Sequence, residues 1–350
     1  MASNDPIDSS WLNQALAQIG RARVAVFGDF CLDAYWLIDP SEEERSVETG
    51  LPVRRVRAQR YSLGGAGNVV ANLAALGAAK VFAVGLIGDD LFGRTMRELL
   101  DGLGADRVGM SSDQSDLATL VYAKPYVGDR ELNRLDFGSF DVISPASIET
   151  LAQRLDAAAS QVDAVMLNQQ IPAGVSSPAM IERINAIIAR HAHCRFLVDS
   201  RDRAELYRGA ILKLNGHEAA RLLGCPRRPE SIEEQIPPAE VVDLARQLTR
   251  RTGQPVFVTR GENGIVAADG DAVHEVAGIR IDGPTDPVGA GDTVAATLAA
   301  ALAGGCDIRT AARLANLAAS VTVRKLQTTG TASPAEIRAA AVTHSPLGRD

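Results

Sequence analysis

The stretch Asp286-Pro287-Val288-Gly289-Ala290-Gly291-Asp292-Thr293 joins an extended, turn-rich segment (276–287) to an Ala/Leu-rich helical run that starts at Asp292. Glycines let a backbone approach a ligand closely, and free N–H groups at a helix start attract an anion. A carboxylate beside a resting anion is unfavourable because like charges repel. We therefore predict that Asp292 is a base for an attacking hydroxyl, while the N–H groups hold a transferring phosphoryl group. The alternative is a glycine turn whose aspartate only caps the helix.

The composition is that of an ordinary globular protein. The chain has 350 residues, of which 46% are hydrophobic and 23% are charged, enough for one large α/β domain. Lys and Arg number 36 against 43 Asp and Glu, and the net charge of −7 argues against a nucleic-acid surface. The four cysteines form no CxxC pair, which is typical of reduced thiols.

The longest apolar run, Val294–Ala303, is about half of the roughly 20 residues that a membrane span needs. The first residues, Met1–Ser10, lack the basic-then-apolar pattern of a signal peptide. We therefore expect a cytoplasmic protein with neither membrane nor nucleic acid among its partners.

Strand and helix patterns alternate along most of the chain. Val24–Phe27 is a continuous apolar run that ends in Gly28-Asp29, and regular strand–helix alternation follows from Ile143 onward. Such alternation indicates right-handed βαβ crossovers and a mostly parallel sheet, whose strand ends are the usual place for a ligand. Polar residues occur at these predicted strand ends: Asp33, Asn168, Asp199, Asn215 and Glu218. The spacing of Asn215 and Glu218 would let both side chains share one ligand or solvated cation.

A second glycine-rich helix start is Leu63-Gly64-Gly65-Ala66-Gly67-Asn68, before a predicted helix at Val69–Leu76. It lacks the third small residue of a dinucleotide fingerprint and follows an arginine-rich segment, so the Rossmann interpretation fails. The P-loop pattern GxxxxGK[ST] occurs nowhere in the chain.

Two regions look like a flap over a site. Residues 41–60 are charged and irregular, and the extended runs Ala118–Val127 and Glu131–Phe137 resemble a hairpin. Lys124 and Arg134 in the second region either meet an anionic ligand or are simply solvated.

Three motifs then converge. Gly64-Gly65-x-Gly67-Asn68, Asn215-x-x-Glu218 and Asp286 through Gly289-Ala290-Gly291-Asp292, in this order, resemble the ribokinase-like (PfkB) carbohydrate kinase family over about Val24 to Ile337. Within it the chain looks most like the D-glycero-β-D-manno-heptose-7-phosphate kinase subgroup, kinase domain only. The segments similar to that subgroup are Val26–Asp29, Leu32–Trp36, Arg134–Phe137, Val258–Arg260, Ala315–Leu326 and Ser333–Pro334. The nucleotidyltransferase domain usually fused to such kinases is expected to be missing.

The resemblance implies a fold and an activity. The fold is α/β, a ribokinase-like three-layer α/β/α domain over residues 1–350, with a mostly parallel central sheet and a small β lid at about 45–62 and 117–138. The activity is ATP-dependent phosphoryl transfer to a hydroxyl of a sugar or sugar phosphate. The lid would also join two chains in a homodimer.

The resemblance also assigns roles to residues. Asp292 would be the catalytic base, with the N–H groups of Gly289, Ala290 and Gly291 as the anion hole. The acceptor would contact Asp33, Gly64, Gly65, Asn68, Asn168 and Arg134. Asn215 and Glu218 would face the phosphates and Mg²⁺, largely through water. The nucleotide would contact Thr259, Gly261, Gly264 and, near the adenine, Asn316. Asp286 would belong to a monovalent-cation loop for K⁺, with carbonyls near Thr322 and Lys325.

Some positions depart from the subgroup. Asn168-Gln169-Gln170-Ile171-Pro172 stands where those kinases carry Asp-Tyr-Ala-Lys-Gly, Asp199-Ser200-Arg201 replaces Asp-Pro-Lys, and Gln327 replaces a glycine. An acid and a lysine are thus lost on the acceptor side, and Arg201 or Arg203 is the candidate replacement for the positive charge. Two alternatives stay open: a family member that phosphorylates another sugar or a nucleoside, and a catalytically silent homologue that acts as a binding or regulatory protein.

Overall fold

The computed structural model describes residues 10–40, 44–112, 117–139, 141–172, 174–225, 236–326 and 328–343, so Gln327 lies outside the described residues. Its main element is a sheet with the strand order β16-β15-β14-β13-β12-β11-β1-β6-β7. The strands are β1 Arg23–Gly28, β6 Lys80–Leu86, β7 Asp106–Ser111, β11 Ala164–Gln169, β12 Arg195–Ser200, β13 Ile211–Asn215, β14 Val256–Thr259, β15 Ile265–Asp269 and β16 Ala272–Val276. Neighbours from β14 to β7 are parallel, whereas β15 and β16 pair antiparallel at one edge. The mostly parallel sheet is therefore confirmed.

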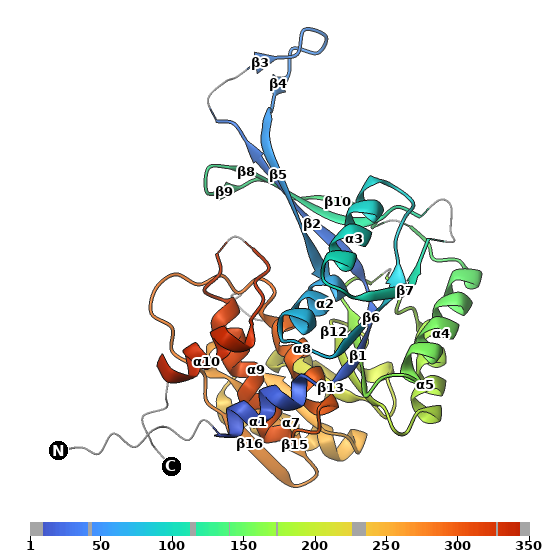
Figure 1. The fold of residues 1–350 in the computed structure, drawn as a ribbon, viewed down its shortest axis with the longest axis vertical. Coiled ribbons are helices and arrows are strands. Elements are labelled where there is room, and N and C mark those ends of the chain that lie inside the picture. Colours follow the sequence, from blue (N-terminus) through green and yellow to red (C-terminus); the bar gives the residue numbers. More distant parts are fainter. Residues whose placement is uncertain are drawn as a thin grey trace, which may run out of the picture.

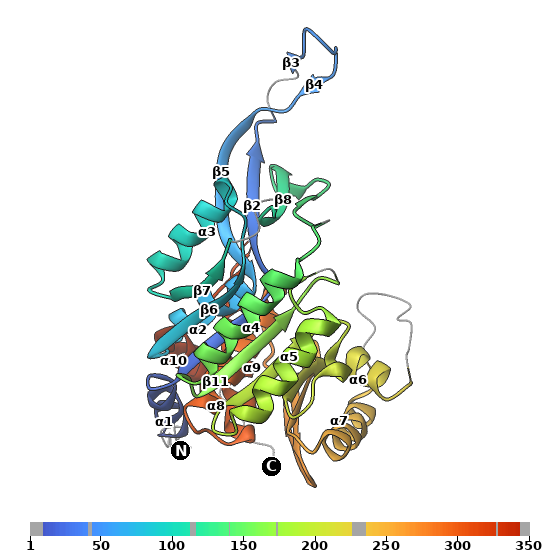
Figure 2. The same cartoon turned by 90° about the vertical axis from the view of Figure 1, so that its right-hand side faces the viewer.

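Helices cover both faces of this sheet (Figures 1 and 2). Side chains alternate along β1, so that Val24 and Val26 belong to one hydrophobic cluster and Ala25 and Phe27 to the other. The first cluster includes side chains of α1 Ser10–Ile19, α2 Ala66–Ala75, α3 Leu91–Gly102, α8 Ala290–Ala303, α9 Ile308–Thr322 and α10 Pro334–Thr343. The second includes side chains of α4 Pro145–Ala159, α5 Pro178–Arg190, α6 Gly216–Leu222 and α7 Pro238–Thr252. Two short 3₁₀ turns, η1 Ala204–Leu206 and η2 Gly261–Asn263, complete the described elements.

A second sheet projects from this three-layer body as a lid (Figure 1). Its strand order is β10-β8-β2-β5, with β9 paired to β8, and a small β3–β4 hairpin lies at its tip. The strands are β2 Phe30–Ile38, β3 Glu44–Arg45, β4 Pro52–Val53, β5 Val56–Gly65, β8 Leu120–Val127, β9 Arg130–Glu131 and β10 Leu135–Phe137. The lid thus contains β2 in addition to the two predicted segments.

The strand β2 corrects one expectation, because Asp33 lies in the lid sheet and not in a loop beyond β1. The chain passes directly from β1 into β2, so the lid is continuous with the centre of the main sheet (Figure 2). Both glycine-rich helices begin earlier than predicted. The helix α2 starts at Ala66 instead of Val69, and α8 starts at Ala290 instead of Asp292.

Candidate active site

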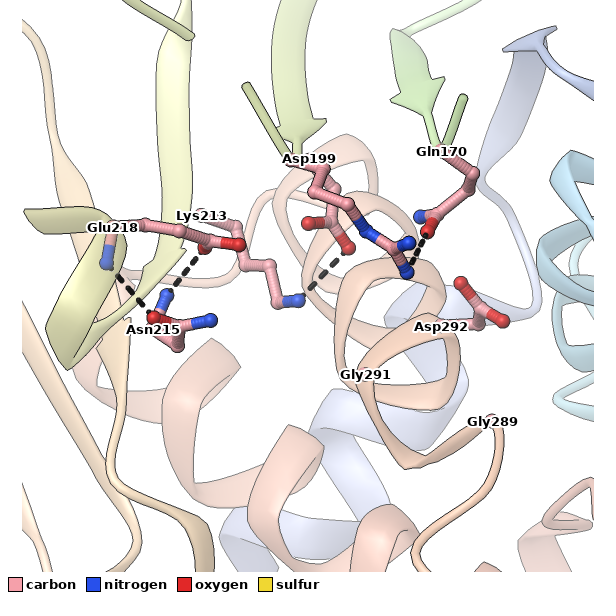
Figure 3. A pocket seen from close by; sticks show the side chains of 9 residues that line it. Gln170, Asp199, Lys213, Asn215, Glu218, Gly289, Gly291 and Asp292 are labelled. Atoms are coloured by element: carbon pink, nitrogen blue, oxygen red, sulfur yellow. Dashed lines mark hydrogen bonds and ion pairs between the residues drawn. The ribbon is translucent and has the colours of Figure 1, made fainter. Parts of the chain in front are cut away.

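Asp292 lies in the first turn of α8, where the chain turns sharply into the helix (Figure 3). The turn depends on Gly289, whose φ of 78° is a left-handed conformation that favours glycine. A Cβ atom on Gly289 would also lie 2.8 Å from Asn68 Nδ2. The glycine therefore allows α8 to begin against α2 with a carboxylate at its end.

Two side-chain amides contact the Asp292 carboxylate. Asn68 Nδ2 donates to Asp292 Oδ2 at 2.9 Å, and Asn168 Nδ2 approaches Oδ1 at 3.5 Å. Solvent reaches part of Asp292, but its carboxyl is surrounded by protein atoms. This burial raises the pKa of Asp292 to about 6, against the lowering effect of the Asn68 hydrogen bond. Such a carboxylate is ionised at neutral pH and is a stronger base than a solvated aspartate.

Lys213 faces Asp292 from the end of β13, and the sequence reasoning missed it. Its Nζ lies 2.8 Å from Asp199 Oδ2, and the two side chains are only 9% and 10% exposed. Burial acts to lower the pKa of Lys213, but the Asp199 carboxylate outweighs it and the pKa is raised. The Nζ atom is also 3.4 Å from where a Cβ of Gly291 would stand. A lysine two positions before Asn215, inside an otherwise apolar strand, was the available signal.

These groups open into a polar cavity of about 350 Å³ (Figure 3). The lining residues come from the ends of neighbouring strands and from the start of α8: Gln170, Asp199, Arg201, Lys213, Asn215, Glu218, Gly289, Gly291 and Asp292. Carboxylates, cations and glycine backbone thus share one hollow, as phosphoryl transfer requires.

The three predicted anion-hole N–H groups are not equivalent. The Ala290 N–H donates to the Pro287 carbonyl at 3.1 Å, and Ala290 does not line the cavity. Within the described residues no acceptor is found for the N–H groups of Gly289 and Gly291, and both glycines line the cavity. The geometry therefore favours these two donors over Ala290, with the Lys213 ammonium beside them.

Asn215 and Glu218 form the predicted pair at the start of α6. The Asn215 side chain accepts from the Glu218 N–H at 2.9 Å, and Glu218 Oε2 accepts from the Asn215 N–H at 2.8 Å. This reciprocal capping box fixes both side chains at the cavity edge. Burial raises the pKa of Glu218, so a cation bound at this carboxylate would favour its ionised form.

The predicted nucleotide residues lie next to the cavity and do not line it. Thr259 is the strand partner of Asn215 in the adjacent β14. Gly261 and Gly264, which has a φ of 88°, form the turn after β14. Asn316 in α9 donates to the Ala277 carbonyl at 2.8 Å. A Cβ on Gly264 would lie 2.7 Å from the carbonyl carbon of Ala277, the residue that Asn316 contacts, so the turn after β14 and Asn316 lie close to each other, next to the Asn215–Thr259 pair.

The predicted acceptor residues lie where the lid meets the body. Asp33 pairs with Lys124 of β8 at 2.9 Å, and both side chains are largely buried. A Cβ on Gly64 would be 3.1 Å from Asp33 Oδ2, so the glycine end of β5 packs against this carboxylate. Gly65, with a φ of 53°, is the residue before α2, which carries Asn68.

Arg134 lies near this group on the lid, because its guanidinium stacks on Tyr122, the strand partner of Asp33. Its guanidinium lies over the Tyr122 ring at 4.3 Å and pairs with Asp136 at 2.6 Å. Arg134 therefore lies on the lid, outside the cavity lining.

The departures at 168–172 and 199–201 form one connected region. Asn168 is fully buried, and its Oδ1 has no hydrogen-bond partner among the described residues. Arg201 lines the cavity and contacts Gln170 at 3.4 Å, whereas Arg203 donates to the carbonyls of Pro172 and Ser176. Arg201 therefore reaches the cavity, whereas Arg203 contacts backbone carbonyls outside the cavity lining.

Asp286 joins the glycine loop to the end of α9. Its N–H donates to the Val323 carbonyl at 2.7 Å, and its Oδ1 accepts from the Val288 N–H at 3.0 Å. The Lys325 N–H in turn donates to the Thr322 carbonyl at 2.9 Å. The two segments expected to form a cation loop are thus adjacent.

In the part of the chain that the structure describes, no helix is both long enough and apolar enough to cross a bilayer.

Several known proteins are similar to this chain over most of its length. The chain is 35% identical over 324 residues to a bifunctional protein HldE of Rhodospirillum rubrum, and 35% identical over 330 residues to one of Rhodopseudomonas palustris. Each alignment covers 91% of this chain, which spans about 62% of the length of either relative.

Solved structures share the fold. Escherichia coli phosphofructokinase-2 in complex with potassium superposes with a TM-score of 0.71 at 18% identity, covering 93% of this chain and 99% of that one. Arabidopsis thaliana ribokinase complexed with ribose and ATP gives a TM-score of 0.66 at 20% identity, covering 91% and 98%. The ribokinase-like fold is thereby confirmed. The family model "pfkB family carbohydrate kinase" matches residues 21–336, and the chain belongs to this family.

Proposed function

We propose that this chain is an ATP-dependent kinase that transfers a phosphoryl group to a hydroxyl of a sugar or sugar phosphate, as a single kinase domain. The observation that carries the proposal is the position of Asp292. Its carboxylate has a pKa of about 6 and shares a cavity with the Gly289 and Gly291 backbone and with the Lys213 ammonium. This arrangement combines a base with groups that stabilise negative charge on a transferring phosphoryl group.

Each residue of the cavity has a distinct role in the proposed phosphoryl transfer. Asp292 takes the proton of the acceptor hydroxyl, while Asn68 holds the carboxylate in place. The Gly289 and Gly291 N–H groups and Lys213 stabilise the charge that develops on the phosphoryl oxygens. ATP supplies the phosphoryl group, and Mg²⁺, when bound, neutralises phosphate charge next to Asn215 and Glu218.

The acceptor side supports a hydroxylated, polar substrate. Asn168 lies beside the proposed base, and its Oδ1 has no donor among the described residues, so an acceptor hydroxyl bound against Asp292 would supply one. Arg201 at the cavity edge offers a positive charge where the subgroup lysine is lost. A heptose-phosphate-like acceptor is therefore the first candidate, and another sugar or a nucleoside is the second.

Three further proposals go with this function. K⁺ would bind at the Asp286 loop, where the chain holds a carboxylate and carbonyl groups close to the anion hole. A homodimer would form through the lid, which projects from the body (Figure 1). A cytoplasmic location is supported by the four free cysteines.

The test is ATP consumption by the purified protein with Mg²⁺ and K⁺, measured against sugars, sugar phosphates and nucleosides. We expect turnover with one acceptor class and its loss in Asp292→Asn. ATP binding without turnover of any acceptor would favour the silent homologue instead.

A further inference from the structure

A chain of buried amides connects the proposed base to the helix on which it stands. Asn72, one turn after Asn68 on α2, is fully buried and donates from Nδ2 to Asn68 Oδ1 at 3.1 Å. Thr293, the residue after Asp292, has its hydroxyl 2.9 Å from Asn72 Oδ1 and 3.2 Å from the Gly289 carbonyl oxygen, so its one hydrogen is shared in favour of the nearer acceptor, Asn72. The hydrogen bonds therefore connect Thr293 to Asn72, Asn72 to Asn68 and Asn68 to Asp292. The first and last of these residues are neighbours on α8.

The direction of every bond in this chain follows from one fixed group. Asn72 Nδ2 also lies 2.9 Å from the backbone carbonyl of Asn68, and a carbonyl can only accept. The NH₂ group of Asn72 must therefore face Asn68, which leaves its Oδ1 to accept from the Thr293 hydroxyl. The same NH₂ group faces Asn68 Oδ1, so the NH₂ group of Asn68 is left to face Asp292. A reversed Asn68 amide would place an oxygen against the carboxylate and an NH₂ group against an NH₂ group.

We propose that Asn72 is a positioning residue, which together with Thr293 fixes the Asn68 amide so that it donates to the general base Asp292. Asn72 has no contact with the reacting groups and acts through Asn68. The proposal rests on the proposed function only for the role of Asp292 as a general base. The hydrogen-bond chain itself is a property of the protein without substrate.

The arrangement has a chemical consequence. The hydrogen bond from Asn68 favours the ionised form of Asp292 and opposes the effect of burial. Of the charged groups around this carboxylate, Asp199 on β12 disfavours its ionisation and Lys213 on β13 favours it. Arg201 and Glu218 line the same cavity, and the Cys31 thiol on β2 interacts with the Asp292 charge. A loosened Asn68 amide therefore leaves the carboxylate harder to ionise and less well oriented toward an acceptor hydroxyl.

The test is the pKa of Asp292 in the substrate-free protein, followed by ¹³C NMR of labelled aspartate carboxyls and assigned with Asp292→Asn. In Asn72→Ala we expect this pKa to rise by about half a unit or more, because the Asn68 hydrogen bond weakens. Asn185→Ala is the matched control. Asn185 is a buried helical asparagine on α5 that bonds Leu206 and Arg208, and its side chain packs in a different layer.

A second pair of variants tests the Thr293 end. Thr293→Val removes the donor to Asn72, together with the longer contact to the Gly289 carbonyl, and should raise the Asp292 pKa in the same direction as Asn72→Ala, which leaves Gly289 untouched. Thr293→Ser keeps the hydroxyl and should leave the pKa unchanged. Thr297→Val is the matched control, because this buried hydroxyl on α8 donates to the Thr293 carbonyl at 2.7 Å and not to Asn72.

An unchanged Asp292 pKa in both Asn72→Ala and Thr293→Val would show that these hydrogen bonds serve only the packing of the two helices. That result would overturn the proposal, whatever the thermal stability of the variants. Because the titration requires no acceptor, it separates this inference from the kinase activity. When an acceptor is known, the low-pH limb of kcat should move upward in Asn72→Ala by the same amount as the NMR pKa.

Discussion

Lys213 Nζ and Asp199 Oδ2 lie 2.8 Å apart at the ends of two neighbouring strands, and each side chain is about nine-tenths buried. Removal of one partner leaves the other charge buried without compensation. We expect Lys213→Met to lower the free energy of unfolding by about 3–5 kcal/mol. The double variant Lys213→Met/Asp199→Asn should recover most of that loss in urea unfolding.

Activity should respond differently from stability. The double variant lacks the ammonium beside Gly291, so we expect ATP turnover to stay low even where the fold is restored. Recovery of both stability and turnover in the double variant would show that Lys213 has only a structural role.

Asp292→Asn tests the catalytic role of Asp292 separately from its effect on the stability of the fold. The amide cannot take a proton from the acceptor, so kcat should fall by about 10²–10⁴-fold, while ATP binding measured by calorimetry stays close to that of the unaltered protein. The raised pKa means that ionisation of Asp292 weakens the fold as pH rises from about 4, its usual range, to about 6. Asp292→Asn should therefore gain stability relative to the unaltered protein between pH 5 and pH 7.5. A loss of ATP binding in parallel with kcat would assign Asp292 to nucleotide binding instead.

The pH dependence of the unaltered enzyme follows from the same pKa. The base must be ionised, so activity should be full above about pH 7 and should fall tenfold per unit below about pH 6. The measurement is kcat against pH at saturating ATP and acceptor. A constant kcat down to pH 5 would contradict a base with a pKa near 6.

The glycine turn can be tested by Gly289→Ala. At a φ of 78° an alanine is strained by roughly 1 kcal/mol, and its Cβ would lie 2.8 Å from Asn68 Nδ2. We expect kcat to fall because the added methyl group displaces the amide from Asp292. Gly305→Ala is the matched control, since Gly305 has a φ of 89° with open space around its Cβ position. Equal kcat losses in both variants would attribute the effect to backbone strain alone.

The sequence allowed the prediction of the sheet and of a glycine turn that brings Asp292 to a helix start, because both rest on local patterns. Apolar runs that end in polar residues indicate parallel strands, and two glycines before a helix indicate an anion-binding turn. The Lys213–Asp199 pair and the Asn68–Asp292 bond depend on strand order and helix packing, which no spacing reveals. For the same reason the strand Phe30–Ile38 was not predicted: its role as the lid strand between β5 and β8 depends on pairing with residues far along the chain.

Asn168 offers the sharpest test of the acceptor side, because it lies beside the proposed base and departs from the acid that the sequence resemblance predicts at this position. Its Nδ2 lies 3.5 Å from Asp292 Oδ1, so Asn168→Asp would place two carboxyl groups side by side. Like charges that close cannot ionise independently, and the pKa of one member of the pair should rise by at least about one unit. The low-pH limb of kcat should therefore move upward, and turnover at pH 6 should fall more than turnover at pH 8. Asn168→Leu, which adds no charge, should lower turnover at both pH values to a similar extent. Equal pH profiles for Asn168→Asp and the unaltered protein would mean that residue 168 does not share the site of the base.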